Sequence, residues 1–304
     1  MKIKAEDLTD LSKPDGGKFK VNSLNEAQEF CRKLAAGHYE NFPVGSVIID
    51  RNLRPDYFSV YAFSRTADDI ADELTHLDKT ELISVLDNYR DLLYNEDFDS
   101  SESGNPIFIA LRHTTEKHDI PAAVLEKLLT AFKRDINFSQ ARNLDDHLDY
   151  CNYSANPVGE LVLRIHGAYN SKTAPLSDKI CSGLQLVNFW QDLSRDIKIG
   201  RHFIPNDLMS KFELTKENLF DENNSAKLKL CLNELYDYTE SLFEEGRELI
   251  PHLPGFRLKK EIAVTIKGGM RILNKSRSLG SEIIYRRPKL NGIDIASILF
   301  RAFF

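Results

Sequence analysis

The most informative part of the sequence is residues 61–73, which read Tyr61-Ala62-Phe63-Ser64-Arg65-Thr66-Ala67-Asp68-Asp69-Ile70-Ala71-Asp72-Glu73. Apolar residues recur here at helical spacing, as they do throughout 54–75, and this pattern predicts a buried helix. Carboxylates four residues apart on one helix repel by roughly 0.2–0.5 kcal/mol per pair, and burying them unpaired would cost far more. The pair of Asp68 and Asp72 in a core-like helix therefore indicates a compensating cation.

A second acidic pair occurs at residues 188–196, which read Asn188-Phe189-Trp190-Gln191-Asp192-Leu193-Ser194-Arg195-Asp196. At about 100° per residue, each pair shares a helix face with polar or basic groups. The first stripe contains Tyr61, Arg65, Asp68 and Asp72, and the second contains Gln185, Asn188, Asp192 and Asp196. A solvated acidic face is the usual explanation of one such pair. Two matching pairs among aromatic residues favour a metal site instead, and ligands that are all oxygen predict Mg²⁺.

Composition excludes several classes of protein. A chain of 304 residues with 42% hydrophobic content can bury a sizeable core, and a net charge of −6 argues against a general nucleic-acid binder. The four cysteines stand far apart without a CxxC motif, which is typical of buried thiols in a reducing compartment. No N-terminal signal sequence is visible, and no apolar run approaches the roughly 18 residues that span a bilayer. We therefore expect a cytoplasmic protein, with a position at the inner face of the membrane as the variant.

The order of apolar segments predicts an all-α fold. Glycine and proline are sparse, strand-like alternation is nearly absent, and long segments at helical spacing dominate. We expect helices within 24–40, 54–75, 79–95, 106–118, 122–139, 157–170, 176–199, 226–251 and 257–285. Residues 1–22 are polar and are expected to be disordered, and residues 23–304 are expected to form a single helical domain.

The chemistry that fits two acidic helices is the departure of a diphosphate. If the pairs face one another across a central cavity, Mg²⁺ ions between them can clamp the leaving group. The carbocation left behind needs an apolar chamber that excludes water and whose aromatic faces stabilise positive charge. The aromatic candidates for its wall are Tyr61, Phe63, Phe132, Phe138, Tyr150, Tyr153, Phe189 and Trp190. For each of them, ordinary core packing is the alternative.

At these residues the chain resembles the squalene/phytoene synthase family of all-α isoprenoid enzymes. Residues 61–73 are similar to its first aspartate motif and residues 185–196 to its second, and Gly200-Arg201-His202-Phe203-Ile204-Pro205 matches the tail that follows. Within the family, Glu40-Asn41-Phe42-Pro43-Val44 resembles the branch that makes hydroxysqualene in the bacterial hopanoid pathway. Two departures from other members, His38-Tyr39-Glu40-Asn41-Phe42 and Gln191, fall at expected diphosphate contacts. They favour an enzyme that takes ready-made presqualene diphosphate.

The resemblance implies a fold, a reaction and a site. The fold is a single-domain isoprenoid-synthase helical bundle with a central cavity, and the reaction is Mg²⁺-dependent loss of diphosphate followed by capture of water. Two or three Mg²⁺ ions are expected, and no NADPH. The expected metal ligands are Asp68, Asp72, Asp192 and Asp196, which are catalytic together with Tyr61. The expected substrate contacts are His38, Arg65, Tyr150, Tyr153, Gln185, Asn188 and Arg201. Asp69 and Glu73 lie on the flank of the stripe, where support of the ligands and exposure to solvent are equally open.

Other functions remain open at this point. Head-to-head condensation to squalene, dehydrosqualene or phytoene would use the same aspartates. A non-catalytic helical assembly factor would not need all four of them, and a di-metal oxidase needs two Glu-x-x-His motifs where only Glu73-Leu74-Thr75-His76 occurs. The partner that we expect is a prenyl diphosphate lipid, with other enzymes of the squalene pathway as further candidates. The apolar tail after Arg286-Arg287-Pro288-Lys289 either docks on its own domain, the commoner outcome, or contacts a membrane surface.

Overall fold

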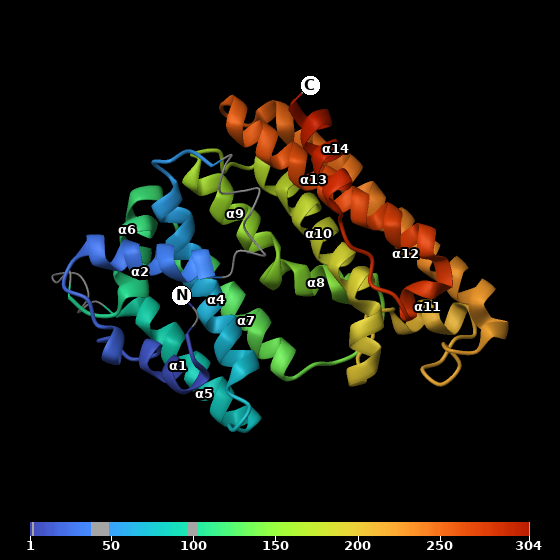
Figure 1. Ribbon diagram of the computed structural model, residues 1–304, viewed down its shortest axis with the longest axis horizontal. Coiled ribbons are helices and arrows are strands. Elements are labelled where there is room, and N and C mark those ends of the chain that lie inside the picture. The colour runs from blue at the N-terminus through green and yellow to red at the C-terminus, as the bar shows by residue number, and fades with distance from the viewer. Residues whose placement is uncertain (2, 38–48, 96–102, 304) are drawn as a thin grey trace. The chain divides into compact units, whose positions relative to one another are not determined.

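A computed structural model of the chain describes residues 1, 3–37, 49–95 and 103–303 (Figure 1). Within these ranges the regular structure is helical, and the extended pairing is limited to one isolated antiparallel bridge between Val21 and Gly104. None of the described helices is long and apolar enough to cross a membrane. The prediction of an all-α fold is therefore confirmed.

The α-helices in chain order are α1 (Ala5–Leu11), α2 (Leu24–Gly37), α4 (Arg54–Glu73), α5 (Lys79–Asp91), α6 (Pro106–His118), α7 (Ala122–Ile136), α8 (Leu144–Ser154), α9 (Asn156–Ile165), α10 (Thr173–Asp196), α11 (Asn206–Lys211), α12 (Ser225–Gly246), α13 (Phe256–Leu279) and α14 (Gly292–Phe303). Short 3₁₀ turns extend several of them, including η5 (Ile197–Ile199), η7 (Arg247–His252) and η8 (Gly280–Ile284). Every segment predicted from apolar spacing overlaps one of these helices. The spacing missed α8, because its sequence is mostly polar and has no apolar period. It also missed α1, α11 and α14.

The chain divides into two compact units, a division that the sequence does not indicate. The first unit is Met1–Phe138 with Glu160–Tyr169, and the second is Ser139–Gly159 with Asn170–Phe304. The structure also differs from the expected disorder of residues 1–22, since α1 packs on α4 and buries Leu8 and Leu11 completely. With only these two apolar anchors, α1 could not be distinguished from a polar coil by periodicity.

The first unit is built around α4, which contacts α2, α6, α5 and α7. Phe63 on α4 is fully buried, stacks on Tyr89 at a centroid distance of 5.2 Å and meets Phe108 edge-on at 5.9 Å. At about 100° per residue, Phe63 lies on the opposite side of α4 from Arg65 and Asp68. Burial of the aromatic face therefore turns the acidic stripe away from this core.

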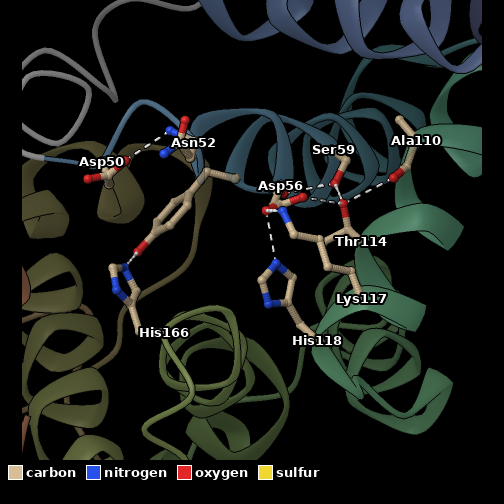
Figure 2. Close-up of polar contacts among 10 residues, drawn as sticks. Asp50, Asn52, Asp56, Ser59, Ala110, Thr114, Lys117, His118 and His166 are labelled. Atoms are coloured by element: carbon tan, nitrogen blue, oxygen red, sulfur yellow. Dashed lines mark hydrogen bonds and ion pairs between the residues drawn. The ribbon is translucent and has the colours of Figure 1, made fainter. Parts of the chain in front are cut away.

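The start of α4 is anchored to the end of α6 by a buried charge (Figure 2). Asp56 is 1% exposed, and its Oδ2 accepts a hydrogen bond from Lys117 Nζ at 2.8 Å and lies 2.9 Å from His118 Nε2. One turn along α4, the Ser59 hydroxyl lies 2.7 Å from the Thr114 hydroxyl. These contacts set the position of α4 against α6.

The second unit is built around α10, which packs against α12 and α13. Trp190 on α10 is fully buried and donates from Nε1 to the Thr239 hydroxyl of α12 at 2.9 Å. Glycine allows the close approach, since a Cβ atom at Gly183 would lie 3.1 Å from the Phe243 ring and one at Gly269 would lie 2.7 Å from it. Trp190 points to the side of α10 opposite Asp192, so the packing orients the second acidic stripe as well.

Candidate active site

The first acidic stripe lies on α4, in the first unit. Pro55 stands in the first turn of α4, where its missing N–H is not needed. The helix then runs without interruption through Glu73, so Tyr61, Arg65, Asp68 and Asp72 share one face as the sequence predicts. Asp68 is half-buried, whereas Asp72 is exposed.

Arg65 joins two carboxylates of this helix. Its Nη1 donates to Asp68 Oδ2 at 2.8 Å, and its Nη2 forms an ion pair with Asp69, which is 4% exposed. Burial alone would lower the pKa of Arg65, but Asp69 and Asp68 together raise it. Asp69 is therefore not exposed to solvent, which was one of its two expected environments. Its carboxylate instead holds the Arg65 guanidinium in place beside Asp68.

The pKa of Asp68 shows that this stripe has excess negative charge. Burial and the neighbouring Asp72 carboxylate raise the pKa of Asp68 to about 6, and Arg65 only partly opposes them. Asp69 and Asp135, which lies in the last turn of α7, add to the repulsion. Sequence reasoning missed Asp135, because only the packing of α7 on α4 brings it near. The stripe would be stabilised by a cation.

The second acidic stripe lies on α10, in the second unit. Gln185 and Asp192 are half-buried and Asn188 is exposed, each on the face that helical phase predicts. Burial and the neighbouring Asp192 carboxylate raise the pKa of Asp196 to about 6, although three arginines oppose the shift. These arginines are Arg201, Arg195 and Arg287. The two stripes thus share one electrostatic character.

Arg287 is the residue at this stripe that sequence reasoning missed. Its Nε donates to Asp192 Oδ1, and its Nη2 donates to Asp192 Oδ2 at 3.2 Å. The signal in the sequence is the pair of basic residues at 286–287, which precedes the apolar tail. Gln191, at which the chain departs from other members of the family, has a buried side chain that donates to the Pro288 carbonyl at 2.8 Å. Gln191 therefore holds the chain beside Arg287.

Arg201 is placed by a turn after α10. Gly200 adopts φ 78°, a left-handed conformation that glycine allows without strain, and the Arg201 N–H then donates to the Asp196 carbonyl at 2.9 Å. The Arg201 side chain lies close enough to Asp196 to oppose the rise in its pKa. The structure thus brings Arg201 to the second stripe as expected. His38 lies outside the described residues.

The aromatic candidates divide into two sets. Phe63 and Trp190 are fully buried in the cores of their units, so for them the cavity-wall prediction is wrong and core packing is correct. Tyr150 of α8 is half-buried, and its ring lies 5.9 Å from that of Phe189. Tyr153 stands one turn further along α8 and is also half-buried. Phe189 in turn stacks on Phe203 at 4.0 Å, so an aromatic cluster lies around the second stripe.

The donor set of the two stripes fits Mg²⁺. Each stripe offers two carboxylates, and the second adds the amide oxygens of Gln185 and Asn188, which are hard oxygen ligands. Within the described residues, no group of three or more His, Cys, Asp or Glu side chains converges on one point, and the two pairs belong to different units. A site made jointly by both pairs therefore stays a prediction. The raised pKa values of Asp68 and Asp196 are the observation that favours a cation at each pair.

Comparison with known proteins places the chain in a family. The family model described as squalene/phytoene synthase matches residues 35–294, which include both acidic stripes. The chain belongs to the squalene/phytoene synthase family. Members of this family use prenyl diphosphates and generally depend on a metal. The hydroxysqualene synthase of Sinorhizobium fredii is 35% identical over 244 residues, which cover 80% of this chain and 81% of that protein. The one of Rhodopseudomonas palustris is 34% identical over 252 residues, covering 82% and 84%.

Solved structures of the squalene/phytoene synthase family agree in fold. The crystal structure of squalene synthase HpnC from Alicyclobacillus acidocaldarius matches with a TM-score of 0.78 and 34% identity, over 90% of this chain and 98% of that one. A dehydrosqualene synthase in complex with a ligand matches with a TM-score of 0.79 at 21% identity, over 92% and 96%, which shows the fold alone. The expected isoprenoid-synthase helical fold is confirmed.

Proposed function

We propose that this chain converts presqualene diphosphate to hydroxysqualene, with Mg²⁺ as cofactor and diphosphate as leaving group. The main observation behind this proposal is that two separate helices each present an aspartate pair in which one pKa is raised to about 6 beside arginines. Such sites accept divalent cations and the anions that come with them. The hydroxysqualene synthases at 34–35% identity support the choice of reaction.

The metal ligands of this proposal are Asp68 and Asp72 from α4 and Asp192 and Asp196 from α10, which together hold two or three Mg²⁺ ions. Bound Mg²⁺ supplies neutralisation of the diphosphate charge as the carbon–oxygen bond breaks. Arg65 and Arg201 bind diphosphate oxygens, because a guanidinium pairs with phosphate at two points. Gln185, Asn188 and Tyr61 donate hydrogen bonds to the same group. His38 is proposed as a further diphosphate contact, on the basis of its sequence motif alone.

The chemical step leaves a carbocation and ends with water. The carbon–oxygen bond of presqualene diphosphate breaks with its electron pair on the diphosphate, and the cyclopropylcarbinyl cation rearranges. Water adds to the rearranged cation and loses a proton, which gives hydroxysqualene. This balance needs no reductant, so no NADPH is expected. Tyr150 and Tyr153, beside the aromatic cluster of the second stripe, guide the cation and the water.

Head-to-head condensation of two prenyl diphosphates is the second candidate. The chain is also similar to phytoene synthases, such as that of Mycobacterium tuberculosis at 26% identity over 284 residues, and to the squalene synthase HpnC at 34% identity. Condensation would use the same four aspartates, so these residues do not separate the two reactions. A non-catalytic assembly factor is the third candidate, and retention of both aspartate pairs with Arg65 argues against it.

One experiment separates the candidates. Purified protein is given Mg²⁺ with presqualene diphosphate or with farnesyl diphosphate, each with and without NADPH, and the products are identified by mass spectrometry. We expect hydroxysqualene from presqualene diphosphate in all NADPH conditions, and nothing when Mg²⁺ is replaced by EDTA. A C30 product from farnesyl diphosphate alone would establish condensation. No turnover of either substrate would favour the assembly factor.

We also propose that the protein contacts an anionic membrane surface through exposed apolar residues of α13 and α14. On α14, Ile293 is 80% exposed and Phe300 is 65% exposed, and Phe256 at the start of α13 is 64% exposed. Lys260 lies over the Phe256 ring at 5.0 Å, and Arg247 and Lys267 line a pocket that Ile293 also lines. Arg271 in the same pocket pairs with Asp294 at 2.7 Å. Apolar side chains bordered by cations fit a lipid interface with anionic headgroups.

Flotation with phosphatidylglycerol vesicles tests the membrane contact. We expect the full chain to float, and Ile293→Ser with Phe300→Ser to remain at the bottom of the gradient. Leu230→Ser is the matched control, because Leu230 of α12 is 58% exposed without belonging to α14. Equal flotation of all three proteins would overturn the proposal. Loss of a dimer in the double variant, with no flotation of the wild type, would make this face a contact between copies. Contacts with other squalene-pathway enzymes stay a prediction.

A further inference from the structure

The segment between η8 and α14 has no helical structure of its own, yet three side-chain contacts hold it in place. Gln191 Nε2 donates to the Pro288 carbonyl at 2.8 Å, and Lys275 Nζ donates to the Lys289 carbonyl at 2.9 Å. Between these points, Arg287 reaches Asp192 through two nitrogens. We call residues 285–289 the latch.

Neighbouring residues of α10 bind neighbouring residues of the latch. Gln191 holds Pro288, and Asp192 holds Arg287. Proline fixes its own φ and keeps the preceding residue in an extended conformation, so Arg287 has few alternative backbone conformations. Gln191 is 8% exposed, and its amide is therefore already desolvated when it donates to Pro288. Loss of that hydrogen bond would leave a buried carbonyl without its donor.

We propose that Gln191 is a positioning residue that seats the latch so that Arg287 occupies Asp192, and that Arg287 must leave this carboxylate before a divalent cation can bind it. The proposal rests on the proposed function only in taking Asp192 as a metal ligand. One carboxylate has two oxygens, and Arg287 contacts both of them. The guanidinium and a cation therefore compete for the same atoms.

Before a metal binds, the contact between Arg287 and Asp192 stabilises the second acidic stripe. Asp192 and Asp196 lie one turn apart on a half-buried face, where like charges repel. Arg287 offsets that repulsion, while Arg195 lies further from Asp192, at 3.8 Å. The latch therefore keeps the acidic stripe in place until the cation replaces the guanidinium.

Binding of Mn²⁺ alone, followed by electron paramagnetic resonance of the free ion, tests this proposal without any substrate. We expect Arg287→Gln to bind Mn²⁺ at least several-fold more tightly than the wild type. Arg286→Gln is the matched control: it removes the same charge from the next residue, whose side chain pairs with Glu282 at 3.2 Å and is 70% exposed. The control separates loss of the competing contact from a general change in charge.

Gln191→Leu provides a second and independent variant. We expect it to tighten Mn²⁺ binding in the same direction as Arg287→Gln, and to increase hydrogen–deuterium exchange of the backbone amides in the latch. Arg286→Gln should do neither. If Arg287→Gln and Arg286→Gln bind Mn²⁺ alike, including the case in which neither binds, the proposal is wrong. If Gln191→Leu leaves exchange and binding unchanged, Gln191 is not a positioning residue.

The outcomes for the latch and for the proposed function are distinguishable. A difference in Mn²⁺ affinity between the two arginine variants supports the latch even in a protein that converts neither prenyl diphosphate. Conversely, if the protein converts presqualene diphosphate but Arg287→Gln and Arg286→Gln bind Mn²⁺ with equal affinity, the proposed function is supported and the proposal about the latch is wrong.

Discussion

Lys117 donates a hydrogen bond to Asp56 at 2.8 Å, and Asp56 is 1% exposed (Figure 2). This pair joins α6 to the first turn of α4, the helix that presents Asp68 and Asp72. A buried carboxylate is tolerated only with such partners, because desolvation of an unpaired charge is costly. The position of the first acidic stripe therefore depends on an ion pair at the other end of the same helix.

Removal of the Asp56 carboxylate should destabilise the first unit. Asp56→Ala leaves Lys117 and His118 without their shared acceptor, and we expect a loss of roughly 2–4 kcal/mol in the free energy of unfolding. Urea denaturation monitored by circular dichroism measures it. Asp91→Ala is the control, since Asp91 pairs with Arg90 at the surface and its side chain is 63% exposed. Equal midpoints for the two variants would contradict the assignment of Asp56 as an anchor.

Asp192→Asn should abolish turnover and leave the fold intact. An amide keeps the shape of the side chain but removes the charge that the metal needs. Product formation from presqualene diphosphate measures activity, and circular dichroism with thermal unfolding measures the fold. Asp237→Asn changes an exposed carboxylate of the second unit, which pairs with Arg277, and should keep full activity. Near-normal rates in Asp192→Asn would remove Asp192 from the metal site.

Arg65→Lys should reduce activity although the charge is kept. Arg65 contacts Asp68 and Asp69 through different nitrogens, and the single ammonium of lysine cannot keep both geometries. Loss of one charge-assisted hydrogen bond is worth about 1.5–3 kcal/mol, which corresponds to roughly 10- to 100-fold in kcat/KM. Steady-state kinetics at saturating Mg²⁺ test this. A kcat/KM within twofold of the wild type would show that the two-point contact is not needed.

Glu261→Gln should change how stability depends on pH. The Oε2 atom of Glu261 on α13 is buried without a hydrogen-bond partner, and burial raises the pKa of Glu261 from 4.5 to about 7. The folded state then binds the proton more tightly than the unfolded state. Stability from this group is therefore fully present below pH 4.5 and is lost as the pH rises through about 7.

Thermal unfolding of the wild type and of Glu261→Gln from pH 4 to pH 8 measures the difference. We expect the two proteins to be similar near pH 4. At pH 8 the variant should be more stable, by at most roughly 3–4 kcal/mol. A constant difference across the whole pH range would show that Glu261 does not titrate between the two states.

The sequence predicted most of the helices and both acidic stripes, because apolar spacing and helical phase act along a single segment. Asp68 and Asp72 share a face for the same reason that Phe63 lies on the other one. Arg287 and Asp135 could not be found in this way. Each reaches its stripe from another part of the chain, through a turn or a packed helix, and no local pattern encodes such a contact.

The same limit explains the misplaced aromatics and the missed helices. Trp190 stands next to a motif residue, but its ring is buried because α12 packs over it and offers the Thr239 hydroxyl. Helix α8 has a polar sequence and is stabilised by what surrounds it, including the contact of His147 with the Phe203 carbonyl at 2.6 Å. In both cases, elements distant in the sequence determine which side chains are buried, so the local sequence pattern does not reveal it.

The ring of Phe243 fills the space left by the absent side chains of Gly183 and Gly269, and so acts as the spacer between α10 and α13. Even a single methyl group at either glycine would push against this ring. Gly183 lies on the same helix, α10, as Asp192, two and a half turns away. A shift of α10 at Gly183 would therefore also move the carboxylates of Asp192 and Asp196. Substitution of either glycine should therefore impair this enzyme, although neither residue takes part in the chemistry.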